Sequence, residues 1–440
     1  MQPHLREPEY LRVLPDGTLK QLNPFTGTEV WTVPGRGHRP IEVRTDDRPI
    51  DPVDVGAHCA FCERNYLATP PEKSRVVRAD GGWERREATP ASALFDTVAE
   101  FRRVPNLFEI LSYHYWHANH SFEPPARIRA QRDAYLAEPE GLVHVLEIAG
   151  TKLRAAGMPG DEVEALSTAE RLEAASGFFG GGHDVVIARR HFVDGATSTS
   201  QLASSGTLSR EEHAQFMAFT VDSVRDLYDA NHFARYVVVF QNWLKPAGAS
   251  FDHLHKQLVA IDERGAQQEA ALARVLENPN IFNEAGPNYA AEQGLVIADN
   301  EHAVAFAGYG HRYPTIEIYS KSAHSSPWEH SADEVEAMSD MVHAMHAATG
   351  PDVPSNEEWH YRPIDLTAPM PWRIMLKWRI STLAGFEGAT KIYLNTITPS
   401  SIRERVVQQL QTLRGIGHVA RDLRIGDEVD LPRDPLHYCR

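Results

Sequence analysis

The chain is short of cysteine and of long apolar runs. Its 440 residues include only three cysteines, Cys59, Cys62 and Cys439, too few for a disulfide framework. No run approaches the roughly 18 consecutive apolar residues of a membrane-spanning helix, and the first residues lack the apolar core of a signal peptide. These two absences lead us to expect a cytoplasmic protein with no membrane partner.

Positive charge is also scarce. The chain has 44 Lys and Arg against 60 Asp and Glu, a net charge of -16. Such a surface repels nucleic acid, so we expect no nucleic-acid partner, whereas a small phosphorylated ligand needs only a locally basic pocket. The hydrophobic fraction of 42% is ordinary for a globular protein, and the length suffices for two or three domain-sized units.

Residue patterns divide the chain into strand-rich and helical parts. The segment up to about Arg48 is rich in turn residues, which predicts short strands. Residues 109–179 are dominated by Ala, Glu, Leu and Arg, and the spacing of Leu142, Val145 and Ile148 fits an amphipathic helix. The sequence therefore predicts a helical insert at about 109–180.

After the insert, a strand–helix–strand–strand unit is predicted twice. Each helix opens with a capping box, Ser209 to Glu212 in the first unit and Ser331 to Glu334 in the second. The predicted strands are 184–188, 236–240 and 253–261, then 315–319, 359–366 and 373–380. This order predicts an α+β fold of two repeats with largely antiparallel sheets and flanking helices, divided into residues 1–262 and 263–440.

The third predicted strand carries the most reactive pattern, His253-Leu-His255-Lys-Gln257. Alternate residues of a strand share a face, so His253, His255 and Gln257 point together. A neutral imidazole is a good nucleophile toward phosphorus, and an amide can donate to a phosphate oxygen. A half-exposed strand with two incidental histidines explains this spacing equally well, because the chain has 22 histidines.

The segment before this strand favours the reactive interpretation. Pro246-Ala-Gly-Ala-Ser250 is a turn of small residues, where backbone N–H groups can approach a phosphate closely.

Several separated stretches resemble the galactose-1-phosphate uridylyltransferase branch of the histidine-triad (HIT) superfamily, in the order of that family. They span about residues 31–403, apart from the insert. The stretches are Arg36-Gly-His-Arg39-Pro40, Cys59-Ala-Phe-Cys62 with Thr69-Pro-Pro-Glu72, Val104-Pro-Asn106, Gly182-His-Asp-Val-Val-Ile187 with His191, Phe240-Gln-Asn242, Gly248-Ala-Ser250, His253-Leu-His255-Lys-Gln257, Ala384-Gly-Phe-Glu387 and Tyr393-Leu-Asn395.

This resemblance implies a role for each matching residue. His255 would receive the nucleotide, Gln257 would bind the transferred phosphate, and Ser250 would contact the other phosphoryl group. The remaining substrate contacts implied are Arg36 and Arg39 to phosphates, Asn106, Asn242 and Gly248 near the nucleoside and phosphate, and Glu387 to acceptor hydroxyls across a dimer interface. His183 is expected to be a structural polar residue.

Cys-x-x-Cys in a reducing compartment is typical of metal or redox chemistry. The resemblance implies that Cys59, Cys62, His191 and His253 form one structural Cys2His2 zinc site, and a reduced dithiol near the surface is the alternative. Where some relatives carry a second His-x-His site, this chain has Arg373, Lys377 and Arg379, so no second metal is expected. These cations would either form a basic strand edge or contact substrate phosphate.

The sequence thus resembles an atypical member of that branch, and the resemblance implies one zinc ion and a homodimer. The implied activity passes a nucleoside monophosphate from a nucleotide sugar to a sugar phosphate or phosphate through a nucleotidyl-histidine. An ADP-sugar or dinucleoside-polyphosphate phosphorylase is the alternative, and a non-catalytic nucleotide-binding protein is a second one.

Overall fold

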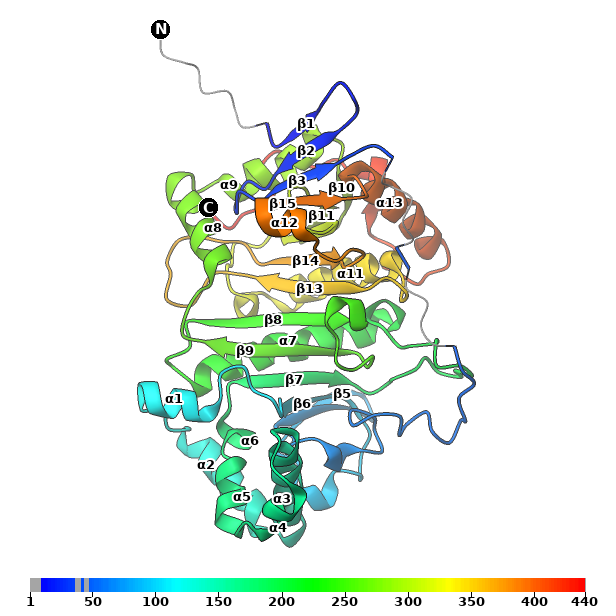
Figure 1. Cartoon of the computed structure of the whole chain (residues 1–440). Coiled ribbons are helices and arrows are strands. Elements are labelled where there is room, and N and C mark those ends of the chain that lie inside the picture. The colour runs from blue at the N-terminus through cyan, green and yellow to red at the C-terminus, as the bar shows by residue number, and fades with distance from the viewer. Residues whose placement is uncertain (1–8, 36–40, 43–46, 440) are drawn as a thin grey trace.

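A twelve-stranded sheet runs through the whole molecule, in the order β16-β10-β11-β12-β14-β13-β8-β9-β7-β6-β4-β5 (Figure 1). The computed structural model describes residues 9–35, 41–42 and 47–439. All neighbouring strands of this sheet are antiparallel. One half comprises β4 (Ser74–Ala79), β5 (Gly82–Glu87), β6 (Ala99–Pro105), β7 (His183–Ala188), β8 (Tyr236–Trp243) and β9 (His255–Ile261).

The other half of the sheet comes from later in the chain and joins the first where β13 pairs with β8. It comprises β10 (Val296–Asp299), β11 (Ala303–Ala307), β12 (Thr315–Ser320), β13 (Ser355–His360), β14 (Arg373–Trp378) and β16 (Arg424–Ile425). The two halves repeat one strand arrangement. In the first half β9 lies between β7 and β8, and in the second half β14 lies between β12 and β13. The predicted two-repeat α+β fold is therefore confirmed.

Three long helices pack against one face of this sheet: α7 (Arg210–Ala230), α11 (Ala332–Thr349) and α13 (Pro399–Gly415). Both predicted capping boxes start their helices, because Ser209 accepts from the Glu212 N–H and Ser331 from the Glu334 N–H. The core beneath the helices is continuous across both halves of the sheet. No helix in the described ranges is long and apolar enough to cross a membrane.

The insert is helical, as predicted, and lies at the β4–β7 end of the sheet (Figure 1). Its amphipathic helix buries Val145 and Ile148 in a small separate core. The insert helices are α1 (Tyr113–His120), α2 (Ala126–Ala137), α3 (Pro139–Ala155), α4 (Gly160–Ala165), α5 (Thr168–Ala174) and α6 (Gly177–Gly180).

A second, four-stranded sheet joins the two ends of the chain, because β15 pairs in parallel with β3. Its strands are β1 (Leu11–Val13), β2 (Leu19–Leu22), β3 (Glu29–Thr32) and β15 (Ile392–Asn395). The helices α8 (Ala266–Glu277), α9 (Ile281–Asn283), α10 (Tyr289–Glu292) and α12 (Gly385–Thr390) complete the C-terminal half.

Two strand boundaries differ from the prediction. β9 begins at His255, two residues later than expected, because His253 turns toward the cysteines instead. β13 covers Ser355–His360, whereas residues 359–366 were predicted. Pro363 cannot donate to a ladder, and the polar residues at the true start of the strand concealed it. Lys377 and Arg379 do not form a strand edge either, since β14 lies inside the sheet.

Candidate functional site

A cavity of about 470 Å³ opens where β9 meets β7 and the turn after β8. His255 and Gln257 line it from one face of β9, as the strand alternation predicts. Ser250 and Asn106 line it as well. Three different segments of the chain therefore bring together four of the predicted site residues.

Hydrogen bonding fixes the tautomer of His255. Its Nδ1–H donates to the carbonyl of His253 at 2.6 Å, which leaves the lone pair on Nε2. The ring is 4% exposed, and burial lowers its pKa to about 4. At neutral pH the imidazole is therefore uncharged, with one nitrogen free to act as a nucleophile.

Gln257 is oriented by His183 on the neighbouring strand β7. The Ile110 N–H donates to Nδ1 of His183 at 3.2 Å, so the proton of this neutral ring lies on Nε2. That Nε2–H donates to Oε1 of Gln257 at 3.0 Å, and the amide nitrogen of Asn106 lies 3.4 Å from the same oxygen. The Gln257 NH2 group is therefore left to donate into the cavity.

His183 is a site residue that the sequence analysis missed. It was assigned a structural role because nothing in its spacing linked it to Gln257. The available signal was the strand register, since His183 and Gln257 both belong to the paired strands β7 and β9.

The other walls of the cavity are mostly apolar and partly aromatic. The Phe61 ring lies edge-on to His255 with centroids 5.2 Å apart, and it also contacts Phe251 at 4.6 Å. Phe108 is 60% exposed and Ile110 is 64% exposed at the opening. An apolar, half-open slot beside two polar groups suits a flat ring that carries a phosphate.

Two asparagines, Asn242 and Asn356, contact the turn before β9 or each other. Nδ2 of Asn356 donates to Oδ1 of Asn242 at 2.7 Å and to the carbonyl of Ala247 at 2.9 Å. Gly248 has φ +91°, a left-handed conformation that favours glycine. Asn242 and Gly248 do not line the His255 cavity. They shape the turn that presents Ser250 to it.

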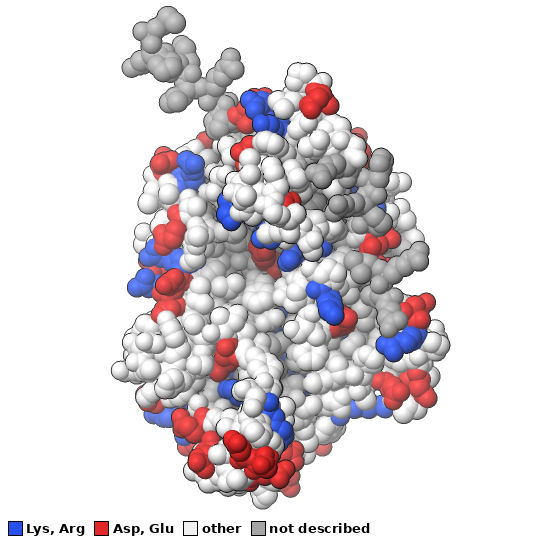
Figure 2. Space-filling view, viewed as in Figure 1, with Lys and Arg blue, Asp and Glu red and all other residues white. Residues whose placement is uncertain are grey.

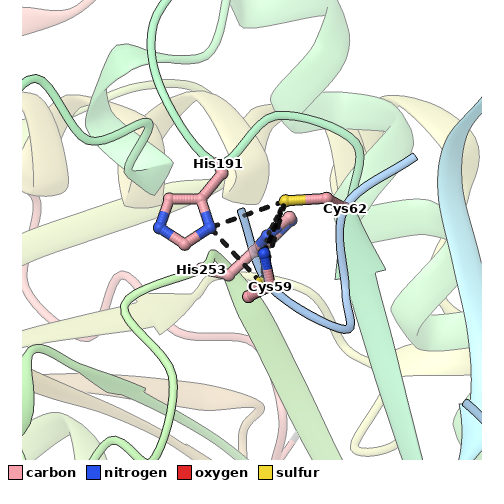
Figure 3. Close-up of side chains that lie close together, drawn as sticks. All are labelled: Cys59, Cys62, His191 and His253. Carbon is pink, nitrogen blue, oxygen red and sulfur yellow. Dashed lines mark hydrogen bonds between the residues drawn. The ribbon is translucent and has the colours of Figure 1, made fainter. Parts of the chain in front are cut away.

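Next to the cavity, Cys59, Cys62, His191 and His253 converge on one point (Figure 3). The two Sγ atoms are 3.8 Å apart, and Nδ1 of each histidine lies 3.4 Å from Sγ of Cys59. With metal–sulfur bonds of about 2.3 Å, a tetrahedron has an S–S edge of about 3.8 Å. The four residues are thus spaced to hold one metal ion.

The protonation states also suit a metal. Nε2–H of His253 donates to the carbonyl of Ala188 at 2.6 Å, so its lone pair is on Nδ1, facing the cysteines. The hydrogen bond between the two cysteines lowers the pKa of Cys62 and raises the pKa of Cys59, which favours one thiolate in the pair. Nδ2 of Asn65 holds the cysteine turn through the carbonyls of Cys59 and Ala57, at 2.9 and 3.0 Å.

One predicted substrate residue, Glu387, lies elsewhere. Glu387 is in α12, near the four-stranded sheet, and its carboxylate accepts from the Ala384 N–H at 3.0 Å. It does not line the His255 cavity. Arg36 and Arg39 fall outside the described residues.

Comparison with known proteins finds a matching family and a curated relative. The sequence matches the family described as Domain of unknown function (DUF4921) over residues 14–438. It is 27% identical to the ADP-glucose phosphorylase of Arabidopsis thaliana over 179 residues, which are 38% of this chain and 50% of that protein. The sequence match therefore spans half the length of this curated relative.

Two solved structures share the fold. The crystal structure of the Arabidopsis ADP-glucose phosphorylase with bound ADP-glucose has a TM-score of 0.56 at 19% identity, covering 88% of this chain and 97% of that chain. A GalT-like protein from Arabidopsis thaliana has a TM-score of 0.54 at 17% identity, covering 88% and 98%. The resemblance to the galactose-1-phosphate uridylyltransferase-like branch is thereby confirmed at the level of fold.

Proposed function

The chain belongs to the family described as Domain of unknown function (DUF4921), and we propose that it is a nucleotidyltransferase acting on a nucleotide sugar. The observation that carries the proposal is the uncharged, single-tautomer His255 beside the Gln257 amide in a cavity lined by Ser250. The proposed acceptor is a sugar phosphate or phosphate.

The proposed reaction has two displacements. Nε2 of His255 attacks the α-phosphorus of the nucleotide sugar, a P–N bond forms, and the pyrophosphate P–O bond breaks to release the sugar phosphate. In the second step an acceptor phosphate oxygen attacks the same phosphorus, and the P–N bond breaks. The Gln257 NH2 group would donate to a phosphate oxygen in both steps, and Ser250 would contact the other phosphoryl group. Arg36 and Arg39 would neutralise phosphate charge, and Asn106 would lie near the nucleoside.

Covalent labelling tests this proposal. The protein is incubated with ADP-glucose or UDP-glucose without acceptor, and the peptide containing His255 is analysed by mass spectrometry. We expect one nucleotidyl group per chain on His255, none in His255→Gly, and normal labelling in His324→Gly, whose histidine is exposed. Full turnover by His255→Gly would exclude the covalent mechanism. Nucleotide binding without any label or turnover would favour a non-catalytic binding protein.

A phosphorylase specific for an ADP-sugar is the second candidate. The relative with the shared fold is named ADP-glucose phosphorylase, and its structure contains ADP-glucose. Labelling by ADP-glucose but not by UDP-glucose, followed by release of ADP on addition of inorganic phosphate, would favour this candidate. Labelling by UDP-glucose would favour uridylyl transfer.

We propose that the metal is a single structural Zn²⁺ held by Cys59, Cys62, His191 and His253. The donor set of two sulfurs and two imidazole nitrogens is one that zinc prefers. Four protein ligands leave no open position, so the ion would supply rigidity and no step of the reaction. His253 would couple the ion to His255, because its carbonyl accepts from the His255 ring.

We further propose a homodimer in which Glu387 serves the partner's cavity. The support is the position of Glu387. Its helix α12 lies near the four-stranded sheet (Figure 1), and Glu387 does not line the His255 cavity of its own chain. Mixing inactive His255→Gly with inactive Glu387→Ala is expected to restore part of the activity. A monomer in sedimentation would contradict this arrangement. The division into residues 1–262, with the insert at 109–180, and 263–440 also remains a proposal.

A further inference from the structure

The C-terminal repeat has its own cavity, over β13 and β14. On this part of the sheet Glu358 of β13 is opposite Met375 of β14, and both line the cavity. Arg373 lies two residues before Met375 on β14, so the two side chains share a face of the strand. A cavity of about 290 Å³ opens there, lined by Arg373 and Met375.

Arg373 is a buried cation in need of a counter-ion. It is only 4% exposed, and among the described residues its charge reaches a carboxylate through Tyr319: its Nη1 lies 3.5 Å from the Tyr319 hydroxyl, which donates to Glu317 at 2.8 Å. Its Nε has no hydrogen-bond partner in the same part of the chain. The guanidinium carbon lies 4.3 Å from the Phe282 ring and 5.3 Å from the Phe25 ring. These rings hold the cation but do not neutralise it.

Two more arginines line the same cavity. The guanidinium carbons of Arg312 and Arg379 lie 5.0 and 4.6 Å from the Tyr313 ring. Nη1 of Arg379 donates to Oδ1 of Asn356 at 2.5 Å, while its Nε is buried without a partner among the described residues. Neither arginine forms an ion pair within the described ranges. Three guanidinium groups therefore face one small space.

The acidic groups nearby offset these charges only in part, although Arg373 is among the groups that lower the pKa of Glu317. Glu358 in the cavity wall pairs with Lys377 at 2.5 Å. Glu317, next to the cavity, pairs with His311 at 2.7 Å. On the face drawn in Figure 2, basic side chains border the hollow across the middle of the molecule. The local surplus of positive charge stands out in a chain whose net charge is -16.

We propose that this C-terminal cavity binds a small phosphomonoester or inorganic phosphate. Arginine forks suit a doubly charged phosphate, and a guanidinium has no lone pair with which to attack phosphorus, so the site binds and does not catalyse. Thr26, Thr28 and Asn23 add neutral polar groups to the wall. The cavity of about 290 Å³, against about 470 Å³ at His255, favours a sugar phosphate or phosphate over a whole nucleotide sugar.

The two cavities are separate sites on one sheet. The strands β9, β8, β13 and β14 are adjacent, which at about 4.8 Å per strand separates the strands carrying His255 and Arg373 by about 14 Å. The proposal therefore goes beyond the nucleotidyl transfer at His255 and does not require it.

Calorimetric titration counts the sites. Glucose 1-phosphate and inorganic phosphate are titrated into the wild-type protein, into Arg373→Met and Arg379→Met, and into Arg274→Met as the control. Arg274 is exposed on α8, close to the cavity-lining Ala271, but does not itself line the cavity. Methionine keeps much of the apolar stem and removes the charge. Circular dichroism checks the fold of each variant.

We expect Arg373→Met to bind one phosphate ligand fewer per chain than wild type or Arg274→Met, and Arg379→Met to bind one ligand at least tenfold more weakly. If the His255 site takes no sugar phosphate, the counts fall from one to none instead of from two to one. The expected difference of one ligand between wild type and Arg373→Met is therefore the same whether or not the proposed activity at His255 is correct. The proposal would be overturned if Arg373→Met bound as many ligands as wild type, with affinities within about twofold of the wild-type values. If Arg373→Met is unfolded, the same result in Arg379→Met would overturn it. A tenfold preference for glucose 1-phosphate identifies a sugar phosphate, and the reverse preference identifies phosphate itself.

Discussion

The His255 ring donates a hydrogen bond to a backbone carbonyl just before its own strand β9. The Gln257 amide accepts a hydrogen bond from a side chain of the neighbouring strand β7. The first contact is local, since His253 is only two residues away. The second comes from His183, which is 74 residues away along the chain. Sequence patterns could therefore point to the proposed nucleophile, but not to the residue that orients the Gln257 amide.

We predict that His183→Leu lowers kcat about tenfold. The Gln257 amide would lose the donor that fixes it, and one hydrogen bond contributes about 1–1.5 kcal/mol, which corresponds to about tenfold in rate. His183→Gln keeps an N–H donor and should recover part of the rate. Steady-state kinetics with a melting curve for each variant measure this. Equal rates for the leucine and glutamine variants at equal stability would contradict the positioning role.

On the other face of β9, Lys256 forms a buried ion pair with Glu357 of β13. Both side chains are fully buried, and His346 of α11 also contacts Glu357 at 2.7 Å. The nearby charges lower the pKa of Glu357 although burial opposes this. The pair explains why a strand reading Ser-Asn-Glu-Glu-Trp-His can lie in the middle of a sheet.

We predict that Lys256→Met destabilises the protein by about 3–5 kcal/mol, because it leaves a buried carboxylate without its main cation. The double variant Lys256→Met/Glu357→Leu should lose less than the sum of the two single variants, because both charges are removed together. Urea unfolding of the three variants gives the comparison. Additive losses would show that the pair is not coupled.

At the scale of elements, the insert is attached to the sheet through a tight contact around α6. A side chain at Gly177 or Gly181 would collide with the Glu109 carboxylate, at 2.4 and 2.1 Å from an added Cβ. The glycines near residue 180 thus make room for Glu109. Burial raises the pKa of Glu109 to about 7, with Lys152 and Lys73 opposing the shift.

We predict that this carboxyl makes stability depend on pH. Its folded pKa lies above the unfolded value of about 4.3, so the folded state holds the proton more tightly. The resulting stabilisation is complete below about pH 4.3 and is lost as the pH rises through 7. Between pH 5 and pH 8 the wild type should lose on the order of 2 kcal/mol more than Glu109→Gln, measured by urea unfolding. Parallel pH profiles for the two proteins would contradict this.

At the scale of the whole molecule, the metal cluster joins three distant parts of the chain. The cysteine turn, the segment after β7 and the entrance of β9 meet at Cys59, His191 and His253. These parts are 132 and 194 residues from Cys59 along the chain. A single ion there would hold the start of β9 in place relative to the cysteine turn and to the segment after β7.

We predict that removing the metal lowers both stability and activity. An ion that binds only the folded chain contributes about 4 kcal/mol when its free concentration is 1,000 times Kd. Chelation should therefore lower Tm, zinc should restore it, and Cys59→Ser should have the lower Tm without responding to either. Metal analysis should give one zinc per chain. Less than half an equivalent in freshly purified protein, or a Tm insensitive to chelation, would contradict the zinc proposal.

The sequence by itself determined the elements whose signals are local. Both capping boxes, the insert helix and the alternation that sets His255 and Gln257 on one face follow from contacts within a few residues, and so do the motif matches. Only the tertiary structure decided the rest. His183 reaches Gln257, Glu357 is neutralised inside a sheet, and Arg373 lines a second cavity with two other arginines. Such contacts depend on strand order and register, which join residues far apart in the chain and leave no mark in its local pattern.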